Sequence, residues 1–159
     1  MNVRFLAAAI TTVGAIPAFL LSQVIWPNPP GMPAPPATLL PFLLVPAIFE
    51  ALAFGMGIAF LVLGFRLLSR AHQPAALTLA AYISIAWSLL SWWPHVNFHR
   101  AIGSDLVALV KVDWTFHMTL IVAAAVIAYF FLRVVGEEVG DRVSAAGYTR
   151  RKVANQSDL

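Results

Sequence analysis

Imidazole and carboxylate side chains occur in two evenly spaced pairs in the second half of the chain. His95 and His99 are four residues apart, and so are Asp113 and His117. Residues at i and i+4 share one face of an α-helix, so each pair presents two polar groups on one side. Pro94 can open a short helix that carries the first pair. Imidazole and carboxylate ligands suit Zn, Fe, Mn or Cu(II), so the spacing predicts a site for a metal ion or a proton.

Glu50 is the only charged residue in the interior of its long apolar stretch. It lies sixteen residues before Arg66, and His117 lies sixteen residues before Arg133. At ~1.5 Å per helical residue, both side chains lie ~24 Å from these basic residues, in the outer half of a bilayer. The matched depth predicts a Glu50–His117 contact. The candidate metal ligands are therefore His95, His99, Asp113, His117 and Glu50.

Three interpretations of this carboxylate–histidine group stay open. It is a site for a divalent transition metal, or a proton or small-substrate site in which Glu50 exchanges protons with His117. Alternatively, Glu50, Asp113 and His117 satisfy one another and only hold two helices in register. The chain has no H-E-x-x-H sequence, no phosphate-binding glycine loop and no nucleophile elbow. Whether the protein is an enzyme, and which reaction it would catalyse, therefore stays undecided.

The composition decides which elements position these residues. Of 159 residues, 60% are hydrophobic, 11% are charged and none is cysteine, with a mean hydropathy of +0.82. A soluble domain carries roughly a quarter charged residues, so a water-soluble single domain is excluded. The lack of cysteine excludes disulfides and thiolate metal sites.

Four apolar stretches are long enough to cross the ~30 Å hydrocarbon layer as helices. The third also carries a stripe of serines, Ser84, Ser88 and Ser91. Short connections favour an all-α, four-helix transmembrane bundle with up-down-up-down topology. This domain covers residues 1–133 and is followed by a polar cytoplasmic tail over residues 134–159; the expected spans are 5–25, 39–68, 75–93 and 106–132.

Basic residues predict the orientation of this bundle. Eight of the ten flank the ends of the spans that would share one side, which should be the cytoplasm. Both termini are then cytoplasmic, and the multi-pass protein lies in a plasma (inner) membrane. No nucleic-acid-binding motif accompanies the basic tail. The expected partners are the lipid bilayer and either a membrane-protein partner or further copies of the chain.

Together these features predict a small integral membrane protein whose polar groups gather toward the outer leaflet. We expect a binding protein, or a subunit of a larger membrane complex, that uses the carboxylate–histidine group for a metal ion or proton. The alternative is a purely structural or assembly subunit with no ligand of its own.

Overall fold

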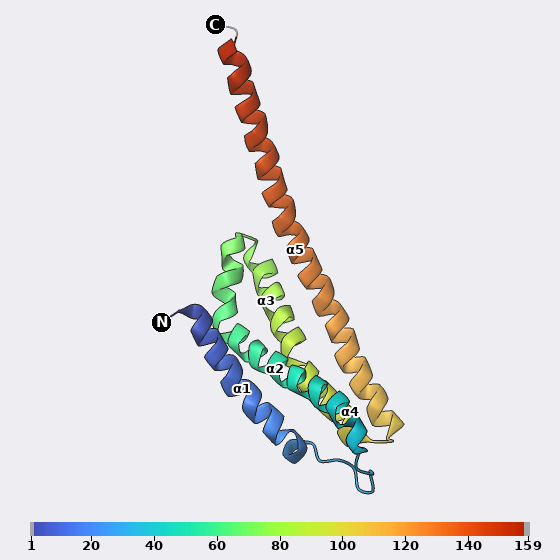
Figure 1. The fold of residues 1–159 in the computed structure, drawn as a ribbon. Helices are drawn as coiled ribbons and strands as arrows, with labels where there is room; N and C mark the ends of the chain where they lie inside the picture. The colour runs from blue at the N-terminus through green and yellow to red at the C-terminus, as the bar shows by residue number, and fades with distance from the viewer. Residues whose placement is uncertain (1, 158–159) are drawn as a thin grey trace.

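The chain is helical from end to end in the computed structural model, which describes the backbone of residues 2–157 and the side chains of residues 2–140. No strand occurs in this part of the chain. The elements, in order, are α1 (Val3–Ile25), the 3-10 turn η1 (Ala37–Leu39), α2 (Leu40–Leu68), the 3-10 turn η2 (Ser69–Ala71), α3 (Ala75–Leu90), α4 (Trp92–Ile102) and α5 (Leu106–Ser157) (Figure 1).

Several of these helices have the length and apolar character needed to cross a membrane. Val3–Ile25, Ala37–Ala71 and Leu106–Gly140 each qualify alone, whereas α3 and α4 qualify only as a pair bent by 42°. The protein therefore has three helices able to span a membrane, or four if the bent pair counts as one span, which is the character of a multi-pass membrane protein.

The bend between α3 and α4 divides the stretch expected as one helix over residues 75–93. Helix α3 ends at Leu90 and α4 begins at Trp92, with Ser91 between them. Pro94 has no backbone N–H, so the carbonyl of Leu90 loses its usual helical donor there. The neighbouring bonds persist, because the amides of Ser91 and His95 donate to the carbonyls of Trp87 and Ser91. The chain therefore bends without unwinding.

Helices α1 and α2 pack with their backbones in contact. A Cβ atom added to Gly55 would meet the Thr11 carbonyl oxygen and lie 2.9 Å from the Ala15 nitrogen. A Cβ added to Gly14 would lie 3.1 Å from the Gly55 Cα atom. Within a membrane, small residues of this kind drive helix association because they allow close van der Waals packing. The close packing of α1 against α2 therefore requires glycine, which has no side chain, at positions 14 and 55.

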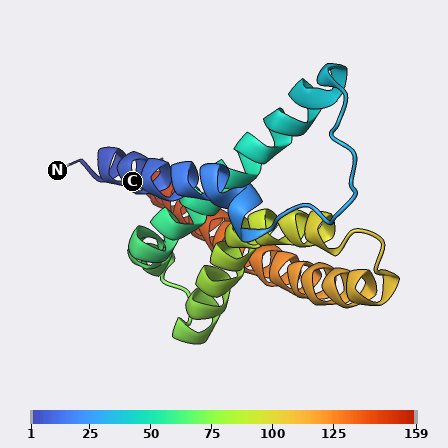
Figure 2. The same cartoon turned by 90° about the horizontal axis from the view of Figure 1, so that it is seen from below.

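Different connections between helices lie at the two ends of the molecule. The 26–36 connection and the turn before α5 lie at the same end (Figure 1), where a Cβ on Gly103 would lie 2.9 Å from Pro29 Cγ. Seen from that end, α4 lies beside the first part of α5 (Figure 2). The α2–α3 connection lies at the other end, where the Gln73 side-chain amide donates to Glu137 of α5 at 2.6 Å.

Helix α5 is much longer than the others. Its 52 residues extend about 78 Å, and its C-terminal part runs far beyond the rest of the fold (Figure 1). Just before that extension, Arg133 pairs with Glu137 at 3.1 Å, one turn later. The polar region expected over residues 134–159 therefore continues α5 as far as Ser157. The side chains of its basic residues, from Arg142 on, lie outside the described part.

Candidate metal centre

Three imidazoles surround one carboxylate oxygen where α4 meets α5. Asp113 Oδ1 lies 2.9 Å from His99 Nε2, 3.9 Å from His117 Nδ1 and 4.0 Å from His95 Nε2. We refer to these four residues as the histidine–aspartate cluster. One ligand atom each from His95, Asp113 and His117 lies within 4.8 Å of the others, a spacing able to hold a metal ion. The two pairs recognised in the sequence thus face one another.

The turn between the two helices brings these pairs together. Gly103 has φ of +61°, a conformation that favours glycine, and it ends α4. The Asp105 carboxylate then accepts hydrogen bonds from the amides of Val107 and Ala108 at 3.0 and 3.1 Å. Such bonds satisfy the free N–H groups at a helix start. Helix α5 therefore begins directly after the turn, and its first turns lie against α4.

The contacts within the cluster restrict where its hydrogens lie. His99 Nε2 lies 2.8 Å from His95 Nε2 and 2.9 Å from Asp113 Oδ1. One of the two facing Nε2 atoms carries a hydrogen and donates it to the other. The ring that accepts carries its own hydrogen on Nδ1 when it is neutral. Asp113 Oδ1 has a close ionic neighbour but no aligned hydrogen bond in the described structure, so its lone pairs stay available.

Aromatic rings fix the plane of the His95 imidazole. The Phe116 ring stacks on it at 4.9 Å and 18°, and Phe116 also stacks on Trp87 of α3 at 5.7 Å and 13°. The Trp87 indole N–H donates to the Thr119 hydroxyl at 3.0 Å, which fixes the last ring of the stack. His95 is therefore the most rigidly held member of the cluster.

The cluster is buried on one side and open on the other. The His95 side chain is only 8% exposed, whereas Asp113 is 37% and His117 is 56% exposed. An ion can therefore approach from the His117 side and meet a fixed imidazole at the back.

Glu50 lies outside this cluster. It is half-buried on α2, and the charge that attracts its carboxylate is that of Arg100 on α4. The direct contact with His117 expected from matched depth is not present among the described residues. Spacing from the basic residues sets depth in the bilayer, but it does not set the rotation of a helix about its axis.

A second polar contact of α4 is made by Asn97, which bonds to α1. The sequence did not predict this contact. Asn97 is 1% exposed, and its amide N–H donates to the Trp93 carbonyl at 2.7 Å. Its carbonyl oxygen accepts from Arg100 at 2.6 Å and from the Ser22 hydroxyl of α1. The only signal available was an amide residue within a membrane protein. Helix α4 therefore uses one face for the cluster and another to bind α1.

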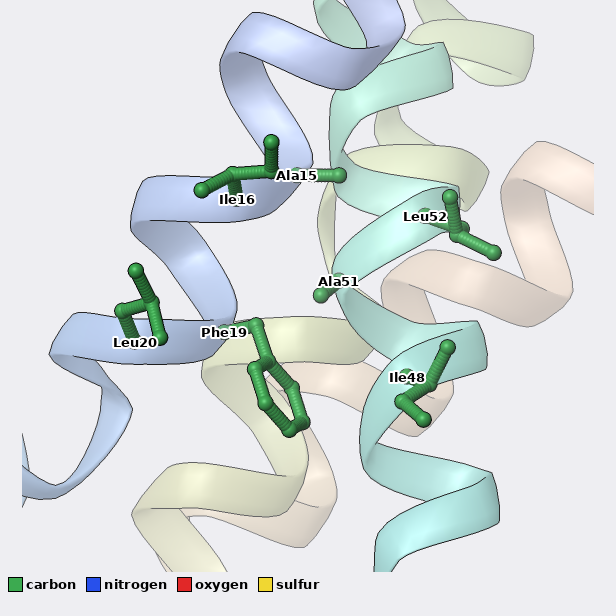
Figure 3. Close-up of a pocket in the computed structure, with 7 residues that line it drawn as sticks. All are labelled: Ala15, Ile16, Phe19, Leu20, Ile48, Ala51 and Leu52. Atoms are coloured by element: carbon green, nitrogen blue, oxygen red, sulfur yellow. The ribbon is translucent and has the colours of Figure 1, made fainter.

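An apolar groove between α1 and α2 is separate from this chemistry. It encloses about 280 Å³ (Figure 3) and is lined only by apolar side chains: Ala15, Ile16, Phe19, Leu20, Ile48, Ala51 and Leu52. It offers no ligand atom to an ion, so the histidine–aspartate cluster is the candidate site.

No family model, curated protein or solved structure matches this chain. The interpretation of the cluster therefore rests on its own chemistry and geometry.

Proposed function

We propose that this chain is a multi-pass protein of a plasma membrane that binds a divalent transition-metal ion through His95, His99, Asp113 and His117. It would act as a binding protein or as a subunit of a larger membrane complex. One observation carries the proposal: three imidazole nitrogens lie within 4.0 Å of a single Asp113 carboxylate oxygen.

The distances within the cluster suit such an ion. Ligand atoms ~2.0 Å from a tetrahedral ion are about 3.3 Å from one another. The ligand atoms of His95, Asp113 and His117 lie within 4.8 Å of one another, so these three residues could close on an ion with small displacements. His99 is not part of that group of three and would be the fourth ligand, 2.9 Å from Asp113 Oδ1. Three neutral imidazoles and one carboxylate favour Zn²⁺ or Cu²⁺ over Mg²⁺ or Ca²⁺, which prefer oxygen ligands.

The expected depth of the cluster also favours ion binding. Asp113 precedes Arg133 by twenty residues, or about 30 Å of helix, which equals the thickness of the hydrocarbon layer. If Arg133 lies at the inner interface, Asp113 lies at the outer interface, within reach of water and dissolved ions. His117 lies about 6 Å deeper on the same helix. The site would therefore be filled from the outer side.

Metal content of the purified protein tests the proposal. After incubation with Zn²⁺ and removal of free ion, we expect elemental analysis of the detergent-solubilised protein to show one ion per chain. Replacing His95, His99 and His117 together by Gln removes the three imidazoles while keeping polar side chains, so bound zinc should fall at least tenfold. Glu50→Gln is the matched control, because Glu50 lies outside the cluster, and this variant should retain wild-type zinc.

Circular dichroism establishes whether each variant is folded. A folded wild-type protein that retains neither Zn²⁺ nor Cu²⁺ would refute the proposal, as would a folded triple variant with undiminished metal.

A structural role is the second candidate, and it has its own support. The 2.9 Å contact between His99 and Asp113 and the stacking of Phe116 on His95 already tie α4 to α5 without an ion. For a subunit that only assembles with others, the triple Gln variant would lower stability or assembly, and the wild-type protein would carry no metal. The same measurements therefore distinguish the two functions.

A further inference from the structure

Three buried polar atoms at the start of α4 have no hydrogen-bond partner among the described residues, and two of them, Ser91 Oγ and His95 Nδ1, are one helical turn apart. Ser91 is 0% exposed and His95 is 6% exposed, so bulk water does not reach either residue freely. An unsatisfied buried polar atom costs about 1–3 kcal/mol, and native structures rarely keep two so close in sequence. The two atoms are not hydrogen-bonded to each other in this conformation, but each has the capacity that the other lacks.

An ion bound at His95 Nε2 would make the two atoms complementary. The ion takes the Nε2 lone pair, so the ring hydrogen lies on Nδ1 and needs an acceptor there. A serine hydroxyl oxygen has two lone pairs and can accept it. The Ser91 hydroxyl hydrogen can in turn be donated to a carbonyl one turn earlier in the helix.

Their positions on the helix bring the two side chains to one face. The His95 amide donates to the Ser91 carbonyl at 3.0 Å, so the chain is helical between them. Helical side chains lean toward the N-terminus, which directs residue 95 over residue 91. Trp93 Nε1 is also unpartnered, but the Trp93 ring packs against Trp26 of α1 at 4.7 Å, away from α5.

We propose that Ser91 is a positioning residue of the metal site: a rotation of its side chain from the position seen here lets Oγ accept a hydrogen bond from His95 Nδ1–H, which holds the His95 Nε2 lone pair toward the ion. This inference rests on the proposed function. Stacking on Phe116 fixes the plane of the imidazole but not which edge faces the cluster. A partner at Nδ1 makes that choice, and it selects the tautomer that a metal needs at Nε2. Outer partners of this kind are worth about 10–100-fold in metal affinity.

Cobalt titration of the full-length protein in detergent tests this role. Co²⁺ serves as the probe because its visible spectrum reports coordination geometry. We expect Ser91→Ala to bind Co²⁺ about 10–100-fold more weakly, with an altered spectrum. Ser84→Ala removes another buried serine hydroxyl, on α3 and outside the cluster, and should match the wild type. Ser91→Thr keeps the hydroxyl and should restore most of the affinity.

Histidine ¹⁵N NMR provides a readout that needs no metal. In the wild-type protein, His95 should be protonated at Nδ1; in Ser91→Ala this preference should weaken. A purely structural role for Ser91 would lower the stability of the protein and leave the tautomer and the cobalt spectrum unchanged, which would overturn the inference. A wild-type protein that shows the Nδ1 tautomer but binds no metal would instead refute the proposed function and leave Ser91 as the partner of His95.

Discussion

At the scale of single residues, Asn97 shows how one buried amide connects helices in an apolar setting. Its oxygen accepts from Arg100 on the same helix and from Ser22 on α1, and its N–H donates to the Trp93 carbonyl. We expect Asn97→Leu to lower the free energy of unfolding by about 1–3 kcal/mol, because Arg100 and the Ser22 hydroxyl then lose a buried acceptor. Thermal unfolding in detergent, followed by circular dichroism, measures the change.

A substitution at an exposed position serves as the control for Asn97. Val107 is 67% exposed on α5, at the same end of the molecule, so Val107→Ala should leave the unfolding transition nearly unchanged. Equal transitions for Asn97→Leu and the wild-type protein would show that the amide does not hold α4 against α1.

Spacing within one helix predicted the side-chain contacts better than depth across helices did. The four-residue intervals His95–His99 and Asp113–His117 predicted pairs that share a face, and the structure brings both pairs together. Equal depth suggested Glu50 beside His117, but no contact between them occurs among the described residues, because depth in the bilayer does not set the rotation of a helix about its axis. The Asn97–Ser22 bond joins residues 75 positions apart, and no local pattern contains such a pair.

At the scale of elements, the α1–α2 contact depends on Gly55. We expect Gly55→Ala to lower the free energy of unfolding by about 1–3 kcal/mol, because the new methyl group would press on the Thr11 carbonyl and the Ala15 backbone. Gly136→Ala is the matched control: a Cβ at Gly136 meets nothing within 4 Å, and alanine favours a helix there. The two unfolding transitions should move in opposite directions. If both variants unfold like the wild-type protein, α1 and α2 do not need this close contact.

The sequence predicted the helices well and their ends less well. Long apolar runs indicated helices near 5–25, 39–68 and 106–132, and α1, α2 and α5 cover these stretches. The interval expected as a single span over 75–93 bends at Ser91, because Pro94 removes one backbone donor in the first turn of α4. Helix α5 continues past Arg133 because no proline follows, and Arg133 pairs with Glu137 one turn later.

At the scale of the whole molecule, the cluster and most of the basic residues occupy opposite ends. The cluster lies near the turn that starts α5, the same end as the 26–36 connection (Figure 1). Arg66, Arg70 and Arg133 mark the other end, where Gln73 binds Glu137. Because basic residues favour the cytoplasmic side, this separation predicts that the histidine–aspartate cluster faces outward.

The cluster faces outward only if the bent α3–α4 pair crosses the membrane. Because the chain has no cysteine, single introduced cysteines can show which connections lie on which side. Three exposed positions lie at or beside successive connections between the helices: Thr38, Ser69 and Ser104. A single cysteine at each position reports the side of the membrane on which that connection lies. If the bent α3–α4 pair crosses the membrane, a membrane-impermeant maleimide on intact cells should label Thr38→Cys and Ser104→Cys. Ser69→Cys should react only after permeabilisation, because Arg66 and Arg70 keep its connection in the cytoplasm. If α3 and α4 instead enter and leave on one side, Ser104→Cys will behave like Ser69→Cys. That result would place the start of α5, and with it the histidine–aspartate cluster, on the cytoplasmic side, and would overturn the four-span topology.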